Sequence, residues 1–161
     1  MYGVTPERNG WRDEAISRRH RLWGISCSAV DLDFLLLEFN YQEPVALVEY
    51  KHIKARVAGI DSGRYMALRK LCDGFHKQGA SGFVHAPIPC LIAIYDPETW
   101  VFRVLPLNQP AKRHYGHVSP DEWLTEYRFV KGLLKLRKSV LTSEDELSLK
   151  TLALQQTNEQ D

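Results

Sequence analysis

Cysteine is scarce in this sequence, and its spacing excludes two common uses of the residue. Cys27, Cys72 and Cys90 are odd in number, far apart and without a CxxC pair. A disulfide framework needs paired cysteines and a zinc site needs closely spaced ligands, so neither is indicated. A free cysteine packs as a small hydrophobic residue. We therefore expect each cysteine to be a buried, reduced thiol.

Long hydrophobic runs are also lacking. No apolar stretch approaches the roughly 20 residues that cross a bilayer, and residues 1–12 are polar, without the apolar core of a secretory signal. We therefore expect no membrane partner and a cytoplasmic location. The net charge is only +1, so composition gives no argument for nucleic-acid binding. Any positive surface has to come from local clusters of basic residues.

Two kinds of catalytic motif are absent. No glycine-rich turn is followed by Lys-Ser or Lys-Thr, which excludes the loop that cradles nucleotide phosphates. The sequence also has no serine or cysteine nucleophile signature. Any chemistry in this chain therefore has to come from other residue types.

The sequence does contain what one globular domain needs. Its 161 residues are 44% hydrophobic and 25% charged, which is enough for a hydrophobic core. We predict a single domain over residues 1–141 and an acidic tail over residues 142–161, either helical or partly disordered. Helices are predicted over residues 12–23, 61–76 and 119–138, and strands over 25–29, 33–39, 44–52, 90–95 and 100–107.

The two strands around the first hairpin are apolar on both faces. Residues 34–37 and 45–48 are continuous apolar runs. That pattern is typical of a central sheet with helices on both sides. The predicted fold class is therefore α/β.

Three ionisable residues interrupt these apolar strands: Asp33, Glu49 and Lys51. Because a strand alternates its faces with period two, Glu49 and Lys51 point the same way. The short loop between the strands pairs Phe39 with Glu43, and the same register sets Asp33 opposite Glu49. Directly opposed residues share a face about 5 Å apart. The sequence therefore predicts two carboxylates and an ammonium group at one spot.

Charges on buried strands are costly without a partner or a purpose. One explanation is a structural salt bridge between Glu49 and Lys51, with Asp33 beside them. Two acids and one base would leave an unbalanced negative charge, and a divalent cation neutralises that charge better than a salt bridge does. Two carboxylates, a backbone carbonyl and water suit Mg²⁺. Such an ion can polarise a phosphodiester and generate hydroxide from bound water.

These residues resemble the motif of the PD-(D/E)xK nuclease superfamily. The resemblance rests on Asp33, a short hairpin and then Glu49-Tyr50-Lys51 in an apolar strand, and it covers roughly residues 12–96. The flanking sequence is similar to that of small phage and bacterial members. The resemblance implies a restriction-endonuclease-like core, with a central mixed sheet in helix–strand–strand–strand–helix–strand order. An extra hairpin strand and a C-terminal helix would follow this core.

The resemblance also implies a set of site residues. Metal ligation would come from Asp33, Glu49 and the backbone carbonyl of Tyr50, with Lys51 as the catalytic lysine and Mg²⁺ or Mn²⁺ as the cofactor. The implied activity is hydrolysis of DNA phosphodiester bonds by a metal-activated water. RNA is an open alternative substrate.

The sequence departs from the family pattern because no proline precedes the motif aspartate. Asp31 is therefore a second candidate on the same face as Asp33, and we favour Asp33 because it lies deeper in the strand. Some members carry an additional acid from the first helix, and Glu14 is the candidate for that role. Two basic clusters would contact the nucleic-acid backbone, namely Arg18, Arg19, His20 and Arg21, and His52, Lys54 and Arg56 next to Lys51.

Two other functions remain as alternatives. The chain could be a catalytically silent nuclease-fold subunit that serves DNA binding or assembly. It could also be a small RNA-processing nuclease that uses general acid–base groups without a metal. A homodimer is expected only if the protein cuts both strands of a duplex, because that task needs two active sites.

Overall fold

The computed structural model describes residues 32, 34–38, 43–57, 59–136, 147, 150 and 151. The chain divides into two units, Met1–Asp31 and Leu32–Asp161, and every described residue belongs to the second. The helix predicted over residues 12–23 and the strand predicted over residues 25–29 lie outside the described residues.

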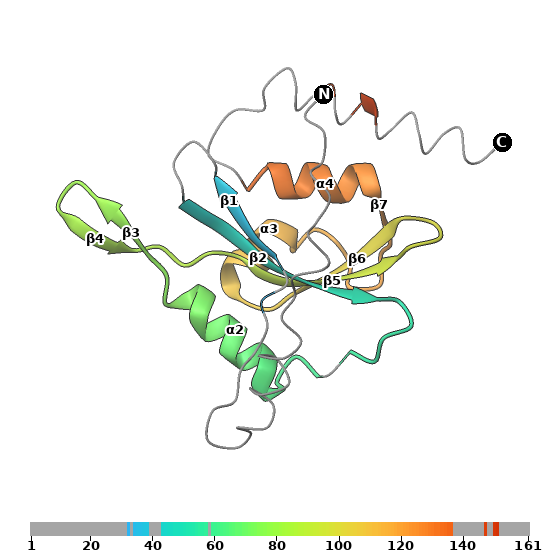
Figure 1. Cartoon of the computed structure of the whole chain (residues 1–161), viewed down its shortest axis with the longest axis horizontal. Coiled ribbons are helices and arrows are strands. Elements are labelled where there is room, and N and C mark those ends of the chain that lie inside the picture. Colours follow the sequence, from blue (N-terminus) through green and yellow to red (C-terminus); the bar gives the residue numbers. More distant parts are fainter. Residues whose placement is uncertain are drawn as a thin grey trace, which may run out of the picture. The chain divides into compact units, whose positions relative to one another are not determined.

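A five-stranded mixed sheet forms the centre of the described unit (Figure 1). The strand order is β1-β2-β5-β6-β7. β2 runs parallel to β5, whereas the other neighbours pair antiparallel. The α/β class predicted from the sequence is confirmed at this level. The strands are β1 (Phe34–Glu38), β2 (Glu43–His52), β5 (Cys90–Asp96), β6 (Val101–Pro106) and β7 (Leu124–Thr125).

The parallel pair needs a crossover connection, because a tight turn can join only antiparallel strands. Helix α2 (Gly63–Asp73) supplies it. A two-stranded hairpin separate from the main sheet then precedes β5, and Figure 1 shows it extending beyond the end of α2. The hairpin consists of β3 (His76–Gly79) and β4 (Gly82–His85).

Helices cover both faces of the sheet, as the apolar strands predict. On one face, Leu47 and Ile92 pack in a cluster with Tyr65 and Leu68 of α2. The other face packs against α3 (Gln109–Tyr115) and α4 (Glu126–Leu134), through a second cluster that includes Val48, Leu91, Phe102, Tyr115 and Phe129. In β2, odd-numbered side chains thus face α2 and even-numbered side chains face α4.

The β1–β2 register agrees with the prediction over most of its length. Phe34 pairs with Val48, the partner that the predicted register gives it. The pairing shifts by one residue between Leu36 and Leu37. At the loop, Glu43 therefore pairs with Glu38, so the predicted partner, Phe39, is wrong. The shift occurs beside Pro44, which has no N–H to donate to the ladder and favours such an irregularity.

Strands β3, β4 and β7 were not predicted, and the helices differ from the sequence prediction at three points. The helix expected to reach residue 76 ends at Asp73, because Gly74 closes it and the chain turns into β3. Helix α3 was not predicted. The helix expected from residue 119 begins at Glu126, where the side chain of Thr125 accepts a hydrogen bond from the Arg128 N–H and caps it.

None of the described helices has the length and apolar character needed to cross a bilayer.

Candidate functional site

Glu49 is the one charged residue among the buried residues of the described chain. Its side chain is 2% exposed, and it follows three fully buried apolar residues of β2, Ala46–Val48. β2 lies between β1 and β5, so Glu49 is held in the interior of the sheet. A carboxylate in such a place is costly unless it is paired.

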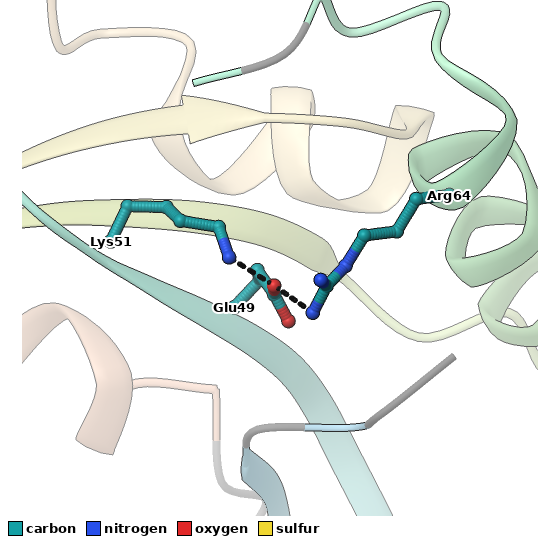
Figure 2. A network of polar contacts seen from close by, with 3 residues as sticks. All are labelled: Glu49, Lys51 and Arg64. Carbon is teal, nitrogen blue, oxygen red and sulfur yellow. Dashed lines mark hydrogen bonds and ion pairs between the residues drawn. The ribbon is translucent and has the colours of Figure 1, made fainter. Parts of the chain in front are cut away.

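Lys51 is the first partner of this carboxylate. Its Nζ donates to Glu49 Oε1 at 2.6 Å, and its side chain is 20% exposed. The two residues lie on the same face of β2, as period-two alternation predicts. Figure 2 shows the ammonium group directed at the carboxylate. This part of the predicted constellation is confirmed.

Arg64 is the second partner, and it lies on the crossover helix α2. It is the second residue of α2, and its Nη2 lies 2.5 Å from Glu49 Oε1 (Figure 2). Its side chain is 41% exposed. The site therefore joins the middle of a central strand to the N-terminal end of the helix that packs on that strand's face.

The charge count differs from the one argued from sequence. The predicted set has two acids, Asp33 and Glu49, and one base, Lys51. The described residues contribute one acid, Glu49, and two bases, Lys51 and Arg64. Adding Asp33 to this set would give two acids and two bases. Charge imbalance alone therefore no longer calls for a metal ion at this site.

The two cations share one oxygen of the carboxylate. Both ion pairs fall on Oε1, and Figure 2 shows no dashed contact at the second oxygen. Among the described residues, Oε2 is thus the oxygen of Glu49 that the cations leave for another ligand.

The backbone of Tyr50 faces the β1 side of the strand. Leu47 N–H donates to Pro89 and Ile53 N–H donates to Tyr95, so odd-numbered residues turn their backbone toward β5 and its loops. Period two then turns the Tyr50 carbonyl toward β1. β1 begins at Phe34 opposite Val48, so Tyr50 lies past the start of β1.

The side chain of Tyr50 lies on the opposite face from Glu49. Its ring makes edge-to-face contacts with Phe34 at 5.1 Å and Phe129 at 6.2 Å between centroids. Burial raises the pKa of the Tyr50 hydroxyl to about 12. The Tyr50 ring is therefore part of the packing between the sheet and α4.

Several predicted site residues lie outside the described residues. These are the acids Asp33, Asp31 and Glu14 and the first basic cluster, Arg18, Arg19, His20 and Arg21. In the described part of the chain, no three His, Cys, Asp or Glu side chains gather in a way that could hold a metal ion. The predicted ligand set includes Asp33, so that observation does not bear on the set as a whole.

The second basic cluster follows the site along the chain. His52 ends β2, and its Nδ1 accepts a hydrogen bond from the Lys54 backbone N–H at 3.0 Å. Lys54 and Arg56 are exposed in the turn that follows. The cluster is thus an exposed turn that carries Lys54 and Arg56, and the His52 side chain hydrogen-bonds to the backbone of this turn.

Arg64 is the residue that sequence reasoning did not place. The spacing of the motif selects no residue on this helix. The structure selects Arg64, while Tyr65 is a buried member of the apolar cluster. One signal was present in the sequence. Arg64 lies in the first turn of the predicted helix that follows β2, where its side chain can reach back toward that strand.

The cysteine prediction holds for the described residues. Cys72 and Cys90 are both buried and free, and they pack in the cluster beneath α2. Cys27 lies outside the described residues.

Comparison of the chain with protein-family models, with curated proteins and with solved structures gives no match. The geometry of the site and the sequence motif are therefore the observations that bear on function.

Proposed function

We propose that this chain is a metal-dependent nuclease that hydrolyses DNA phosphodiester bonds, with Glu49 and Lys51 in its active site. The observation that carries the proposal is the Glu49–Lys51–Arg64 cluster. A buried acid sits on a central strand, with a lysine two residues later on the same face and an arginine from the crossover helix. The acid and the lysine have the spacing of the PD-(D/E)xK motif.

The topology is compatible with the nuclease core that this motif implies. The motif strand β2 pairs antiparallel with β1, crosses over through α2 and then pairs in parallel with β5. Phe34 has the register partner that a Glu49–Asp33 pairing requires. We infer from this arrangement that Asp33 supplies the second carboxylate of the site.

The described residues fit a divalent cation at this position. Glu49 offers the oxygen that the two bases do not contact, and the Tyr50 carbonyl turns toward the same edge of β2 as Asp33 would occupy. Oxygen ligands of this kind suit Mg²⁺ or Mn²⁺. When bound, the ion would supply Lewis acidity and a water of lowered pKa.

Lys51 and Arg64 would act on the phosphate. Hydrolysis builds negative charge on the phosphate oxygens, and a cation held at that point stabilises the transition state. Lys51 is 20% exposed and Arg64 is 41% exposed, so both cations can reach a bound substrate. An arginine guanidinium can contact two phosphate oxygens at once. We assign charge stabilisation to Lys51 and phosphate positioning to Arg64.

The N-terminal end of α2 adds to the attraction for phosphate. Its first turn carries no acidic residue, and its N-cap, Ser62, makes no side-chain capping bond. The Ser62 hydroxyl is buried without a hydrogen-bond partner among the described residues. Free N–H groups and the helix dipole make such an end favourable for an anion.

A silent subunit is the second candidate, and one observation favours it. Glu49 already has two cationic partners, so the cluster would be a satisfied structural network if no metal or substrate entered it. On that hypothesis the chain would bind DNA or assemble with a partner through the same surface, without cleavage.

Cleavage of a panel of labelled DNAs tests the proposal. The panel holds linear, nicked, flapped and four-way substrates with roughly 5–10 mM Mg²⁺, an excess that a weakly held ion needs. Mn²⁺, a chelator and an RNA copy of the linear substrate form parallel arms. We expect cleavage of at least one DNA that the chelator abolishes, and the preferred substrate would define the role of the protein.

A matched pair of lysine variants controls the experiment. Lys51→Ala should lower the cleavage rate by about 100-fold or more, in the range of losing one group that stabilises transition-state charge. Lys112→Ala removes an exposed lysine of α3 that is far from the motif in sequence, and it should cleave normally. No cleavage with either metal would favour the silent subunit. Cleavage that persists in chelator would favour the metal-free RNA-processing type.

A further inference from the structure

A second polar site lies on the other face of the sheet, between α3 and α4. We call it the α3–α4 cavity. Its volume is about 240 Å³, and its lining contains no carboxylate from the described part of the chain. The charged and ionisable side chains of the lining are all basic apart from two tyrosines. They are His114, His117, Arg128, Lys131 and Lys135.

Tyr115, one of the residues that line the cavity, carries a buried polar group without a partner among the described residues. Tyr115 is 3% exposed, and its hydroxyl has no hydrogen-bond partner among the described residues. Leaving a buried hydroxyl unpaired is costly, and such exceptions in folded proteins call for an explanation. Burial also raises the pKa of this hydroxyl, so it stays protonated and can donate.

Gly132 allows α4 to approach this hydroxyl closely. A Cβ at Gly132 would lie 3.1 Å from the Tyr115 hydroxyl oxygen. The carbonyl of Gly132 accepts a hydrogen bond from His114 Nε2 at 2.8 Å, which ties α3 to α4 beside the cavity. Helices α3 and α4 therefore contact each other here through the Tyr115 ring, the His114 side chain and the Gly132 backbone.

The two lysines that line the cavity have no carboxylate partner among the described residues. Among the described residues, Lys131 and Lys135 take part in no ion pair, whereas Arg128 contacts Glu122 at 2.7 Å. Lys131 Nζ instead lies 3.4 Å from the Tyr127 hydroxyl. The described residues thus neutralise the positive charge at this cavity only in part.

We infer that the α3–α4 cavity binds a phosphate group. A phosphate offers several acceptor oxygens and a charge that lysine and arginine side chains complement. Lys131, Lys135 and Arg128 would supply the positive charge that holds the phosphate at the mouth of the cavity. The cavity is smaller than the roughly 300 Å³ at which pockets for drug-sized ligands begin. It therefore takes the phosphate of a nucleotide or of a strand end and leaves the rest of the ligand outside.

This cavity is distinct from the Glu49 site. Tyr115 packs in the cluster with Val48 and Phe129, whereas Glu49 lies on the face covered by α2. The inference does not depend on the proposed nuclease activity. Phosphate binding that Lys131→Met weakens, found in a protein that cleaves no DNA, would support the cavity and count against the nuclease, so failure of one proposal is distinguishable from failure of the other.

Calorimetric titration of the full chain with inorganic phosphate and with a deoxynucleoside monophosphate tests the site. We expect saturable binding, with Kd raised about tenfold in Lys131→Met, the loss of one charge-assisted contact. Lys112→Met changes an exposed lysine of α3 that does not line the cavity, and it should bind like the wild type. No saturable binding of either probe, or equal affinity in the two variants, would overturn the inference.

Tyr115→Phe is a structural control, because the Tyr115 hydroxyl is fully buried and a ligand in the cavity does not reach it. This variant should bind phosphate with unchanged Kd. Its ligand-free form should melt at the same or a higher temperature, because an unpaired buried group has been removed.

Oligonucleotides with and without a 5′-phosphate distinguish the two sources of the ligand. Preference for the phosphorylated strand, lost in Lys131→Met, would assign the cavity to a strand end. Binding of the free monophosphate with no preference between the two strands would assign it to a free nucleotide.

Discussion

The buried carboxylate of Glu49 depends on two cations that are themselves partly exposed. The acid is 2% exposed, against 20% for Lys51 and 41% for Arg64. Removing the two cations is therefore not equivalent to removing the acid. Without its cations the acid stays buried and unpaired, whereas without the acid the cations can turn to solvent.

The double variant Lys51→Met/Arg64→Met should therefore destabilise the protein by about 3–5 kcal/mol, the cost of leaving a buried charge unpaired. Glu49→Gln should cost clearly less, because no buried charge remains. Urea denaturation measures both free energies of unfolding. Lys112→Met serves as the control for loss of an exposed lysine. Equal losses for the two changes would show that the acid does not need these partners.

Tyr50 makes a different prediction, because only its backbone belongs to the proposed site. Its pKa is raised to about 12 by burial, against about 10 for an exposed tyrosine. Stability from the neutral hydroxyl is therefore fully present below about pH 10 and is lost as the pH rises toward 12. The contribution amounts to at most about 2 kcal/mol, since the ring is only partly enclosed.

Tyr50→Phe should reduce the loss of stability between about pH 10 and pH 12 and keep DNA cleavage near the wild-type rate. Unfolding free energies across this pH range and a cleavage assay at neutral pH measure the two effects. A variant that folds normally but has lost cleavage would mean that the hydroxyl, and not the backbone carbonyl, is what the site needs.

At the scale of secondary structure, Asn108 joins elements that the sequence left unconnected. Its side-chain oxygen accepts hydrogen bonds from the Cys90 and Ala111 N–H groups. Its side-chain nitrogen donates to the Ile88 carbonyl and to Asp73 Oδ1. The residue therefore caps α3 and ties it to the start of β5 and the end of α2.

Asn108→Ala should destabilise the protein by about 3 kcal/mol, because the Cys90 N–H and the Ile88 carbonyl would lose buried hydrogen bonds. Chemical denaturation measures the loss. The neighbouring exposed residue provides the control, and Gln109→Ala should change stability by less than about 0.5 kcal/mol. A cost for Asn108→Ala no larger than that of the control would rule out this role.

The same elements show where sequence patterns were sufficient and where they were not. β2 and β5 were predicted within one residue at each end, because their apolar runs are bounded by polar or turn-forming residues. The start of α4 was missed by several residues. Ser119 and Pro120 give a strong local signal for a helix start, but the chain instead forms a turn, and then β7, which pairs with β6. That pairing is a long-range contact that a local signal does not contain.

The hairpin β3–β4 was missed for a related reason. Its strands are short and polar, with a mixed pattern of exposure, so no period-two apolar signal marks them. The turn between them depends on Gly82, whose φ of 116° favours glycine. Two glycines near residues 79–82 were the only local indication of a turn.

At the scale of the whole molecule, the sheet separates two positively charged regions. Arg64 and Lys51 lie on the face under α2, and the α3–α4 cavity lies on the face under α4. The layered α/β architecture could be predicted because apolar runs on both faces of β2 require helices on both sides. The Glu49–Lys51 pair could be predicted from strand geometry alone.

What sequence could not supply was the contact between distant elements. Arg64 reaches Glu49 only because α2 packs across β2, and Tyr115 lines the cavity only because α4 approaches α3 at Gly132. Both depend on tertiary docking of helices, which neither periodicity nor motif spacing encodes.

On the proposed function, Glu49 serves the chemistry of DNA cleavage and not only the fold. Single-turnover cleavage by Glu49→Gln, with DNA binding measured in parallel, tests it most directly. We predict a rate at least about 1000-fold below wild type, a loss of transition-state stabilisation near 4 kcal/mol, with DNA affinity within a few-fold. Glu98→Gln, at an exposed glutamate of the β5–β6 turn, should cleave normally. Cleavage at the wild-type rate by a folded Glu49→Gln protein would contradict a role of Glu49 in cleavage.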